Sequence, residues 1–303
     1  MKNMKKLIAL LLAAVCMLTF AACGGKTEAT TVPTDPQETL DEVKDDVFDQ
    51  MESIANDNAG ADVGSYAEGS DADFTWEATE GGVMITEYIG TNTSVAVPAQ
   101  LGGQDVVAIG DAAFAGKEVV GVSLPDTVVT IGEEAFYYCL ALVEVRFGAG
   151  VRTVGLDAFH GCVALSDVYL NEGLQEIGER AFCMCGMVKS IQLPGTLETI
   201  GVGAFTMAGL PSVTVPGSVK LVDMQAFAYC SELTTVAIED GAVTLGDEVF
   251  QNCKALKDVT LPGSVTEFGW DVFSYCENFV IHAPAGSAAE SYAAEFNHTF
   301  KSN

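Results

Sequence analysis

Positive charge is scarce in this 303-residue sequence, which has 14 Lys and Arg against 42 Asp and Glu and a formal net charge of −28. Proteins that bind nucleic acids or anionic bilayers rely on clustered Lys and Arg to neutralise phosphate groups. The charge balance therefore argues against a nucleic-acid role. Hydrophobic residues nevertheless make up 49% of the chain, which excludes global disorder and leaves ample material for a core.

Residues typical of catalytic and metal sites are also few. The three histidines are His160, His282 and His298, and the sequence has no nucleophile elbow, zinc-protease motif or phosphate-binding loop. The segments Cys183-Met184-Cys185 and His160-Gly161-Cys162 lack the paired spacing of a structural zinc site. We therefore expect no catalysis, no metal and no cofactor.

The one long apolar run, Leu7 to Phe20, has about fourteen residues, fewer than the roughly 20 that a membrane span needs. Lysines precede it, and Ala21-Ala22-Cys23 follows, as in a signal peptide that resembles the lipobox of bacterial lipoproteins. The resemblance implies a signal peptide over residues 1–22 and lipidation of Cys23, although Phe20 stands where Leu is usual. Cys16 is an alternative lipidation site, and an ordinary signal peptide is another interpretation.

An acidic segment, residues 23–73, follows the expected anchor. Its composition predicts an extended tether, because like charges repel and no sustained apolar pattern is present. One stretch, residues 40–56, begins with a capping-box pattern and repeats apolar residues at helical spacing. This predicts a short helix, which either docks on a partner or is a marginal helix within the tether.

A repeat dominates the rest of the chain. A phenylalanine returns every 22 or 23 residues, at Phe114, Phe136, Phe159, Phe182, Phe205, Phe227, Phe250 and Phe273. A glycine precedes it by four residues, except at Asp223, and an alanine or valine directly precedes it. A cysteine follows it by three residues at Cys139, Cys162, Cys185, Cys230, Cys253 and Cys276.

A fixed period of 20–29 residues indicates a leucine-rich-repeat solenoid. The wording of the repeat, L-x-x-V-x-L-P-x-x-V-x-x-I-G-x-x-A-F-x-x-C, resembles the BspA-like leucine-rich-repeat family of surface proteins. The predicted fold is an α/β-type repeat solenoid, mostly β and right-handed, with about eight coils over residues 95–281. A hairpin at residues 74–94 and a C-terminal segment at 282–303 with a helix should cap its two ends.

Each repeated position should stack on its equivalents about 4.8 Å apart, the spacing of parallel strands. We expect the phenylalanines to form a buried spine and the glycines to adopt backbone angles that side chains forbid. The stacked cysteines point the same way, which favours buried free thiols over disulfides. Cys183 lies outside this column and is expected to be exposed.

Repeat proteins bind partners through exposed positions of successive strands. Two columns of strand residues form the predicted partner-binding face, which consists of Glu144, Arg146, Asp167, Tyr169, Ser190, Gln192, Thr214, Thr235, Asp258 and Thr260. Ser123, Ala237 and His282 extend it. The expected function is adhesion or interaction with an extracellular protein, at the outer face of a bacterial membrane. A glycan-binding module and a passive spacer are the alternatives, and Tyr169 is the one aromatic in the columns that could stack on a sugar.

Overall fold

The computed structural model describes residues 53–54, 56–58, 61, 63–242 and 244–303. The predicted lipidation site, Cys23, and nearly all of the predicted helix at 40–56 lie outside the described residues. Ser53, Ile54 and residues 56–58 are helical. Residues 58–303 form one compact unit, which the following paragraphs describe.

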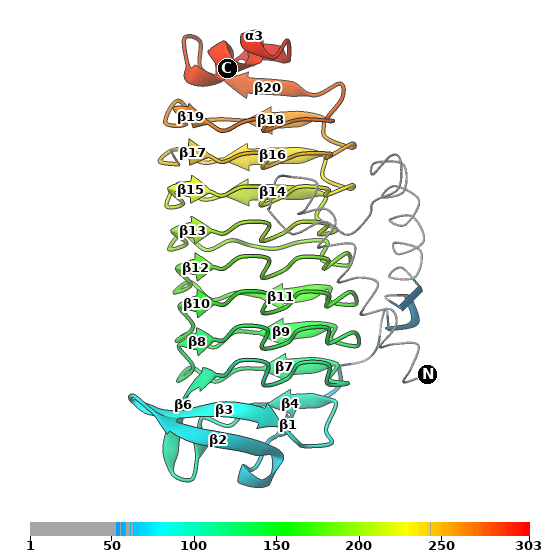
Figure 1. Ribbon diagram of the computed structural model, residues 1–303, viewed down its shortest axis with the longest axis vertical. Coiled ribbons are helices and arrows are strands. Elements are labelled where there is room, and N and C mark those ends of the chain that lie inside the picture. The colour runs from blue at the N-terminus through cyan, green and yellow to red at the C-terminus, as the bar shows by residue number, and fades with distance from the viewer. Residues whose placement is uncertain (1–52, 55, 59–60, 62, 243) are drawn as a thin grey trace, which may run out of the picture. The chain divides into compact units, whose positions relative to one another are not determined.

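This unit is a stack of flat coils, and most coils carry two short strands, here called the front strand and the back strand, which lie at the right and the left of Figure 1. The front strands form two parallel sheets. The first consists of β1 (Ala67–Glu68), β4 (Ser94–Ala96), β7 (Gly121–Ser123), β9 (Glu144–Arg146) and β11 (Asp167–Tyr169). The second consists of β14 (Ser212–Val215), β16 (Thr235–Ile238), β18 (Asp258–Thr260), β20 (Val280–Ala283) and β21 (Thr299–Ser302).

The back sheet has 11 strands, of which ten follow one continuous order and the other, β5, pairs with β6 at its side. Its members are β2 (Phe74–Thr79), β3 (Gly82–Tyr88), β6 (Gln104–Ile109), β8 (Thr130–Ile131), β10 (Thr153–Val154), β12 (Glu176–Ile177), β13 (Thr199–Ile200), β15 (Leu221–Val222), β17 (Thr244–Leu245) and β19 (Glu267–Phe268). β5 is Gln100–Leu101. The predicted solenoid is therefore confirmed, with more coils than the eight that the phenylalanines mark.

The phenylalanine column lies in the core between front and back strands. All eight rings are buried, and neighbouring ring centroids are 4.8 to 5.7 Å apart. The rings lie nearly parallel, with an interplanar angle of 2° between Phe159 and Phe182. Because each ring packs on the next, this column ties every coil to its neighbours.

Both ends of the core are covered. At the N-terminal end, the antiparallel hairpin of β2 and β3 places Tyr88 on Phe114, with their ring centroids 5.1 Å apart. At the C-terminal end, helix α3 (Ala288–Glu295) begins at Ser287, whose hydroxyl accepts from the Glu290 N–H. Tyr292 of this helix stacks on Phe268 at 4.6 Å. The predicted hairpin and helix caps are confirmed.

The folded unit begins before the boundary expected at Phe74. β1 pairs in parallel with β4, and the 3-10 helix η1 (Asp71–Asp73) connects β1 to the hairpin. The segment before β1 also contacts the front sheet, because a Cβ added at Gly121 would lie 2.4 Å from the Val63 side chain. Part of the segment expected to be a tether is therefore packed structure.

The repeated glycines have a different role from the one expected. Neither they nor Asp223 have positive φ. A Cβ added at Gly155 would lie 2.8 Å from the carbonyl carbon of Gly132, and one added at Gly269 would lie 2.4 Å from that of Gly246. The backbones of successive glycines pack directly on one another. Side chains are therefore excluded from this column because the neighbouring backbone is too close, and not because of the φ angle.

Left-handed residues occur instead two positions before and two positions after each phenylalanine. In the second coil these are Glu134, with φ of 54°, and Tyr138, with φ of 49°. Their N–H groups and that of Phe136 donate to carbonyls of the following coil at 2.7 to 2.9 Å. Left-handed backbone costs about 1–2 kcal/mol per non-glycine residue, and these hydrogen bonds between coils offset it.

The cysteines in the described residues are free thiols, as predicted. Each cysteine of the column donates its S–H to the carbonyl of the phenylalanine in the preceding coil, at distances of 3.0 to 3.3 Å. Burial raises the pKa of the Cys230 thiol to about 12. Cys230 is therefore chemically inert, because the reactive thiolate does not form there at ordinary pH.

The expected exposure of Cys183 is wrong. Cys183 is completely buried. It directly follows a phenylalanine, and the equivalent residues His160, Thr206 and Gln251 are buried as well. This position points into the stacked turns, which the sequence period alone does not reveal.

Candidate functional site

Nine of the ten residues predicted to form the partner-binding face are exposed, seven of them on front strands and two, Ser190 and Gln192, in the coil between the two front sheets. Strand register places Arg146 beside Tyr169 and Glu144 beside Asp167 in one sheet. In the other sheet, Thr235 lies beside Asp258, and Thr214 and Thr260 lie on either side of Ala237. Within each sheet, the residues of the two columns therefore lie side by side as the sequence predicts, but each column is divided between two sheets.

Glu144 is the residue that the prediction misplaced. Only 9% of it is exposed, because the segment before β1 covers it. The Tyr66 hydroxyl donates to the Glu144 carboxylate, and Arg146 donates to it through Nε at 2.7 Å and Nη2 at 2.9 Å. Burial tends to raise the pKa of Glu144, but the hydrogen bonds from Arg146 and Tyr66 lower it below its usual value. Glu144 supports Arg146 and is not itself available to a partner.

Arg146 and Tyr169 form the most distinctive exposed pair of the face. The guanidinium carbon lies 4.2 Å from the centroid of the Tyr169 ring, and Tyr169 is 46% exposed. Glu144 and Tyr169 together hold the guanidinium, so its conformation is fixed before any partner arrives. Such a preorganised Arg and Tyr pair can donate hydrogen bonds and offer a flat apolar surface at little entropic cost.

A break in the front ladder lies next to this pair. β11 ends the first sheet and β14 begins the second, while the coil between them has no front strand (Figure 1). In that coil, Ser190 forms an isolated bridge with Asp167, and residues 191–194 are in no strand. β14 pairs with β16 but not with the preceding coil.

Pro211 explains why one backbone hydrogen bond between β14 and the coil before it is missing. At the equivalent position of most other coils, an N–H donates to the carbonyl of the coil before it, as from Val143 to Val120 at 2.8 Å and from Lys257 to Thr234 at 2.9 Å. Pro211 accepts from the Thr234 N–H like its equivalents, but it has no N–H to donate to Lys189.

Coil length is not the cause. The spacing from Phe205 to Phe227 is 22 residues, one fewer than in most coils, and that from Phe114 to Phe136 is the same. In the latter coil the equivalent residue is Val120, whose N–H donates to Thr93 at 2.6 Å. There β7 pairs on both sides. A shortened coil therefore keeps the ladder when it carries valine and loses it when it carries proline.

The break opens a hollow of about 490 Å³ in the front face. Its lining consists of Glu172, Ser190, Ile191, Gln192, Leu193, Gly195, Ser212, Thr214, Pro216 and Glu239. Ser190, Gln192 and Thr214 were predicted as face residues. The remaining lining residues, including Glu172 and Glu239, were not predicted. Pro211 was the one signal in the sequence for a break in the ladder.

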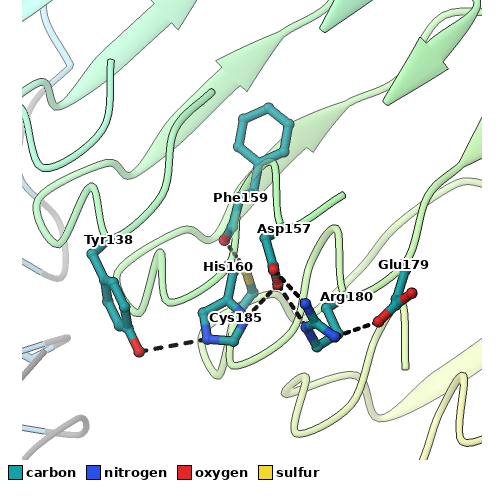
Figure 2. A network of polar contacts seen from close by, with 7 residues as sticks. All are labelled: Tyr138, Asp157, Phe159, His160, Glu179, Arg180 and Cys185. Atoms are coloured by element: carbon teal, nitrogen blue, oxygen red, sulfur yellow. Dashed lines mark hydrogen bonds and ion pairs between the residues drawn. The ribbon is translucent and has the colours of Figure 1, made fainter. Parts of the chain in front are cut away.

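A second polar cluster lies inside the stacked turns (Figure 2). Arg180 donates to Asp157 through Nε at 2.9 Å and Nη2 at 2.6 Å, and His160 Nδ1 lies 3.0 Å from Asp157. His160 is 3% exposed and Asp157 is 7% exposed. Tyr138 Oη is 3.5 Å from His160 Nε2. The cluster resembles catalytic groups in composition, but its burial makes it a link between coils.

The two most exposed aromatics of the described residues lie outside the predicted face. Trp270 is 81% exposed and Tyr275 is 69% exposed, both in the last phenylalanine coil.

Within the described residues, no group of three or more His, Cys, Asp or Glu side chains is arranged to hold a metal ion. No helix in the same part of the chain is long and apolar enough to cross a bilayer.

The coils match the family model described as the BspA type leucine-rich repeat region, in six copies over residues 107–234 and 221–289. Among solved structures, a leucine-rich repeat protein of T. pallidum is 29% identical with a TM-score of 0.60, covering 78% of this chain and 98% of its own. A leucine-rich cell surface protein of Faecalibacterium prausnitzii is 22% identical with a TM-score of 0.50, and the match covers 73% of this chain and 77% of that protein. The second similarity shows the fold alone. No curated protein is significantly similar to this chain.

Proposed function

Because the chain belongs to the BspA-type leucine-rich repeat family, we propose that it is a surface module that binds another protein through its front strands. The preorganised pair of Arg146 and Tyr169 carries this proposal. Arg and Tyr are enriched among the residues that dominate the energy of protein interfaces. Here both are exposed, contact each other and lie beside a hollow with polar lining. The F. prausnitzii protein of similar fold is described as a cell surface protein.

Binding should be measured with residues 24–303, which contain the whole compact unit, against a panel of extracellular-matrix proteins, mucins and isolated glycans. We expect saturable binding to a protein. The double variant Arg146→Ala and Tyr169→Ala should weaken it by about 2 kcal/mol or more, as loss of an interface anchor does. Because this change also removes two hydrogen bonds to the buried carboxylate of Glu144, the thermal unfolding of the variant should be measured to show that it is folded at the temperature of the binding assay. Unchanged affinity in this variant would remove the pair from the proposed interface.

A matched control replaces a cation and an aromatic away from the front strands. The variant Lys254→Ala and Tyr275→Ala fits this purpose, because both residues are exposed and neither belongs to the front strands. It should bind the protein partner as the unaltered chain does. A loss equal to that of the first variant would mean that binding is spread over the surface and not focused on the front face.

Glycan binding is the second candidate, and exposed Trp270 and Tyr275 favour it more than Tyr169 alone does. Aromatic rings are common platforms for sugars because their apolar faces stack on the pyranose ring. Binding restricted to glycans and lost in Trp270→Ala would support this function over protein binding. If the chain binds no member of the panel, the passive spacer is the better description of its function.

We also propose that lipid on Cys23 holds the module at the outer face of a bacterial membrane. The apolar run and the small residues before Cys23 support this. Several acyl chains give firm attachment, because each buried CH₂ contributes about 0.8 kcal/mol. In a bacterial host fed a labelled palmitate analogue, Cys23→Ser should abolish incorporation, whereas Cys16→Ser should retain it. The opposite pattern would move the anchor to Cys16.

A further inference from the structure

The edge of β14 is an unpaired strand edge in the middle of the solenoid. Elsewhere on the front, residues equivalent to Ser212 donate their N–H backward, as Asp258 does to Thr234 at 3.2 Å. Residues equivalent to Thr214 accept through their carbonyl, as His282 does from Leu261 at 2.9 Å. Within the described residues, Ser212 and Thr214 form no such bond to the preceding coil. Their backbone groups therefore face the hollow without a backbone partner.

Free strand edges normally carry features that prevent pairing with other chains, such as lysines or proline. β21, the outer edge of the same sheet, includes Lys301. β14 has the sequence Ser-Val-Thr-Val, with alternating exposed and buried residues and no charge. Pro211 precedes this strand and opens the edge, but it does not block Ser212 or Thr214.

Charge at the hollow selects one kind of strand. Glu172 and Glu239 are exposed members of its lining, which contains no Lys or Arg. Lys189, which precedes the lining residue Ser190, has its ammonium group 2.6 Å from Glu232. The whole chain carries a net charge of −28, which adds a long-range attraction for cations.

We propose that the hollow binds an extended basic segment of a partner protein, which adds to the edge of β14 as a parallel strand. Strand addition supplies affinity through main-chain hydrogen bonds, and flanking side chains supply specificity. Here the N–H groups of Ser212 and Thr214 and the carbonyl of Thr214 pair with the peptide backbone. Glu172 and Glu239 attract its Lys or Arg side chains. This inference rests on the proposed protein-binding function and identifies the chemistry of the bound segment.

A synthetic peptide of alternating Lys and Thr, about six residues long like a typical strand, is a suitable probe. Its affinity for residues 24–303 should be measured by fluorescence anisotropy at low salt. Methylation of the peptide's alternate backbone nitrogens on the bonding edge removes the hydrogen bond that the peptide donates to the Thr214 carbonyl and retains the charge. We expect binding that is about fivefold weaker for the methylated peptide, as the loss of one hydrogen bond implies. Equal affinity of the two peptides would overturn strand addition.

Variants of the chain test the location. Pro211→Val should close the edge and weaken binding of the unmethylated peptide at least tenfold. The double variant Glu172→Gln and Glu239→Gln should weaken it too, whereas Glu198→Gln, an exposed carboxylate beside the back strand β13, should not. No saturable binding to the unaltered chain, or binding unaffected by Pro211→Val, would refute the site.

The two proposals can fail separately. If a partner from the panel loses affinity in the variant of Arg146 and Tyr169 but not in Pro211→Val, the face binds protein and the strand-addition site is wrong. If both variants lose affinity for the partner and the Lys-Thr peptide competes with the partner for the unaltered chain, the hollow is part of the interface. Competition by an oligosaccharide instead of the peptide would contradict a basic peptide as the occupant.

Discussion

Asp157 shows how a buried charge holds neighbouring coils together. Burial by itself raises the pKa of this carboxyl, but hydrogen bonds from His160 and Arg180 lower it below its usual value. Because Asp157 comes from one coil and Arg180 from the next, the ion pair joins the two through side chains. Asp157 also has φ of 52°, an angle that Asp and Asn tolerate better than most residues.

The substitution Asp157→Asn keeps the shape and the tolerance for this backbone while it removes the charge. It should destabilise the chain at pH 7 by about 3 kcal/mol, since it leaves Arg180 partly buried without its counter-charge. A carboxyl with a lowered folded pKa stabilises above its unfolded pKa of about 4 and loses that contribution as pH falls through the folded value. Urea denaturation at several pH values should therefore show the difference shrinking below about pH 4.

The matched control is Asp271→Asn. Asp271 occupies the equivalent position of a later coil, has φ of 51° and is exposed. Its replacement should change stability by less than about 0.5 kcal/mol, as exposed substitutions usually do. If both variants lose the same stability, the loss comes from the left-handed turn and not from the ion pair.

One proline accounts for the missing hydrogen bond between β14 and the coil before it. Pro211→Val should restore an N–H that donates to the Lys189 carbonyl, as Val120 donates to Thr93 in the coil of equal length. We expect a gain of about 1 kcal/mol for the added hydrogen bond. Amide exchange of residues 211–214 should slow. Exchange that remains as fast as in the unaltered chain would show that the two sheets stay apart for another reason.

The reverse substitution is a demanding control. Val120→Pro removes the corresponding bond from an intact ladder and should cost about 1–3 kcal/mol, with faster exchange between β4 and β7. Folded protein with an unchanged exchange pattern would mean that side-chain packing, and not this backbone bond, keeps the front strands in register.

Periodicity predicted the solenoid, its caps and the residues that face outward, because a core that repeats every coil must repeat its apolar residues. It could not predict that Glu144 is covered, since Tyr66 belongs to a segment without the repeat. Nor could it place the hollow. Pro211 was visible, but its effect depends on the register that aligns it with Val120, which only the hydrogen bonds define.

Stacking also concentrates charge. Equivalent positions of adjacent parallel strands lie about 4.8 Å apart, and strand register puts the acidic residues Glu144 and Asp167 at neighbouring positions. The chain has a net charge of −28 with few cations to compensate. Self-repulsion of such a charge destabilises the compact state, while the packed phenylalanine column opposes it.

Salt should therefore stabilise the protein. Raising NaCl from 0.01 to 0.15 M shortens the Debye length from about 30 to about 8 Å. If screening contributes about 1 kcal/mol, the unfolding midpoint rises by about 2–4 °C for a unit of this size. Calorimetry in the two buffers measures it, and a non-ionic osmolyte at equal osmolality should give a smaller rise. A lower midpoint in salt would mean that ion pairs such as Arg180 with Asp157 outweigh the repulsion, because screening weakens attractions between opposite charges as well as repulsions between like ones.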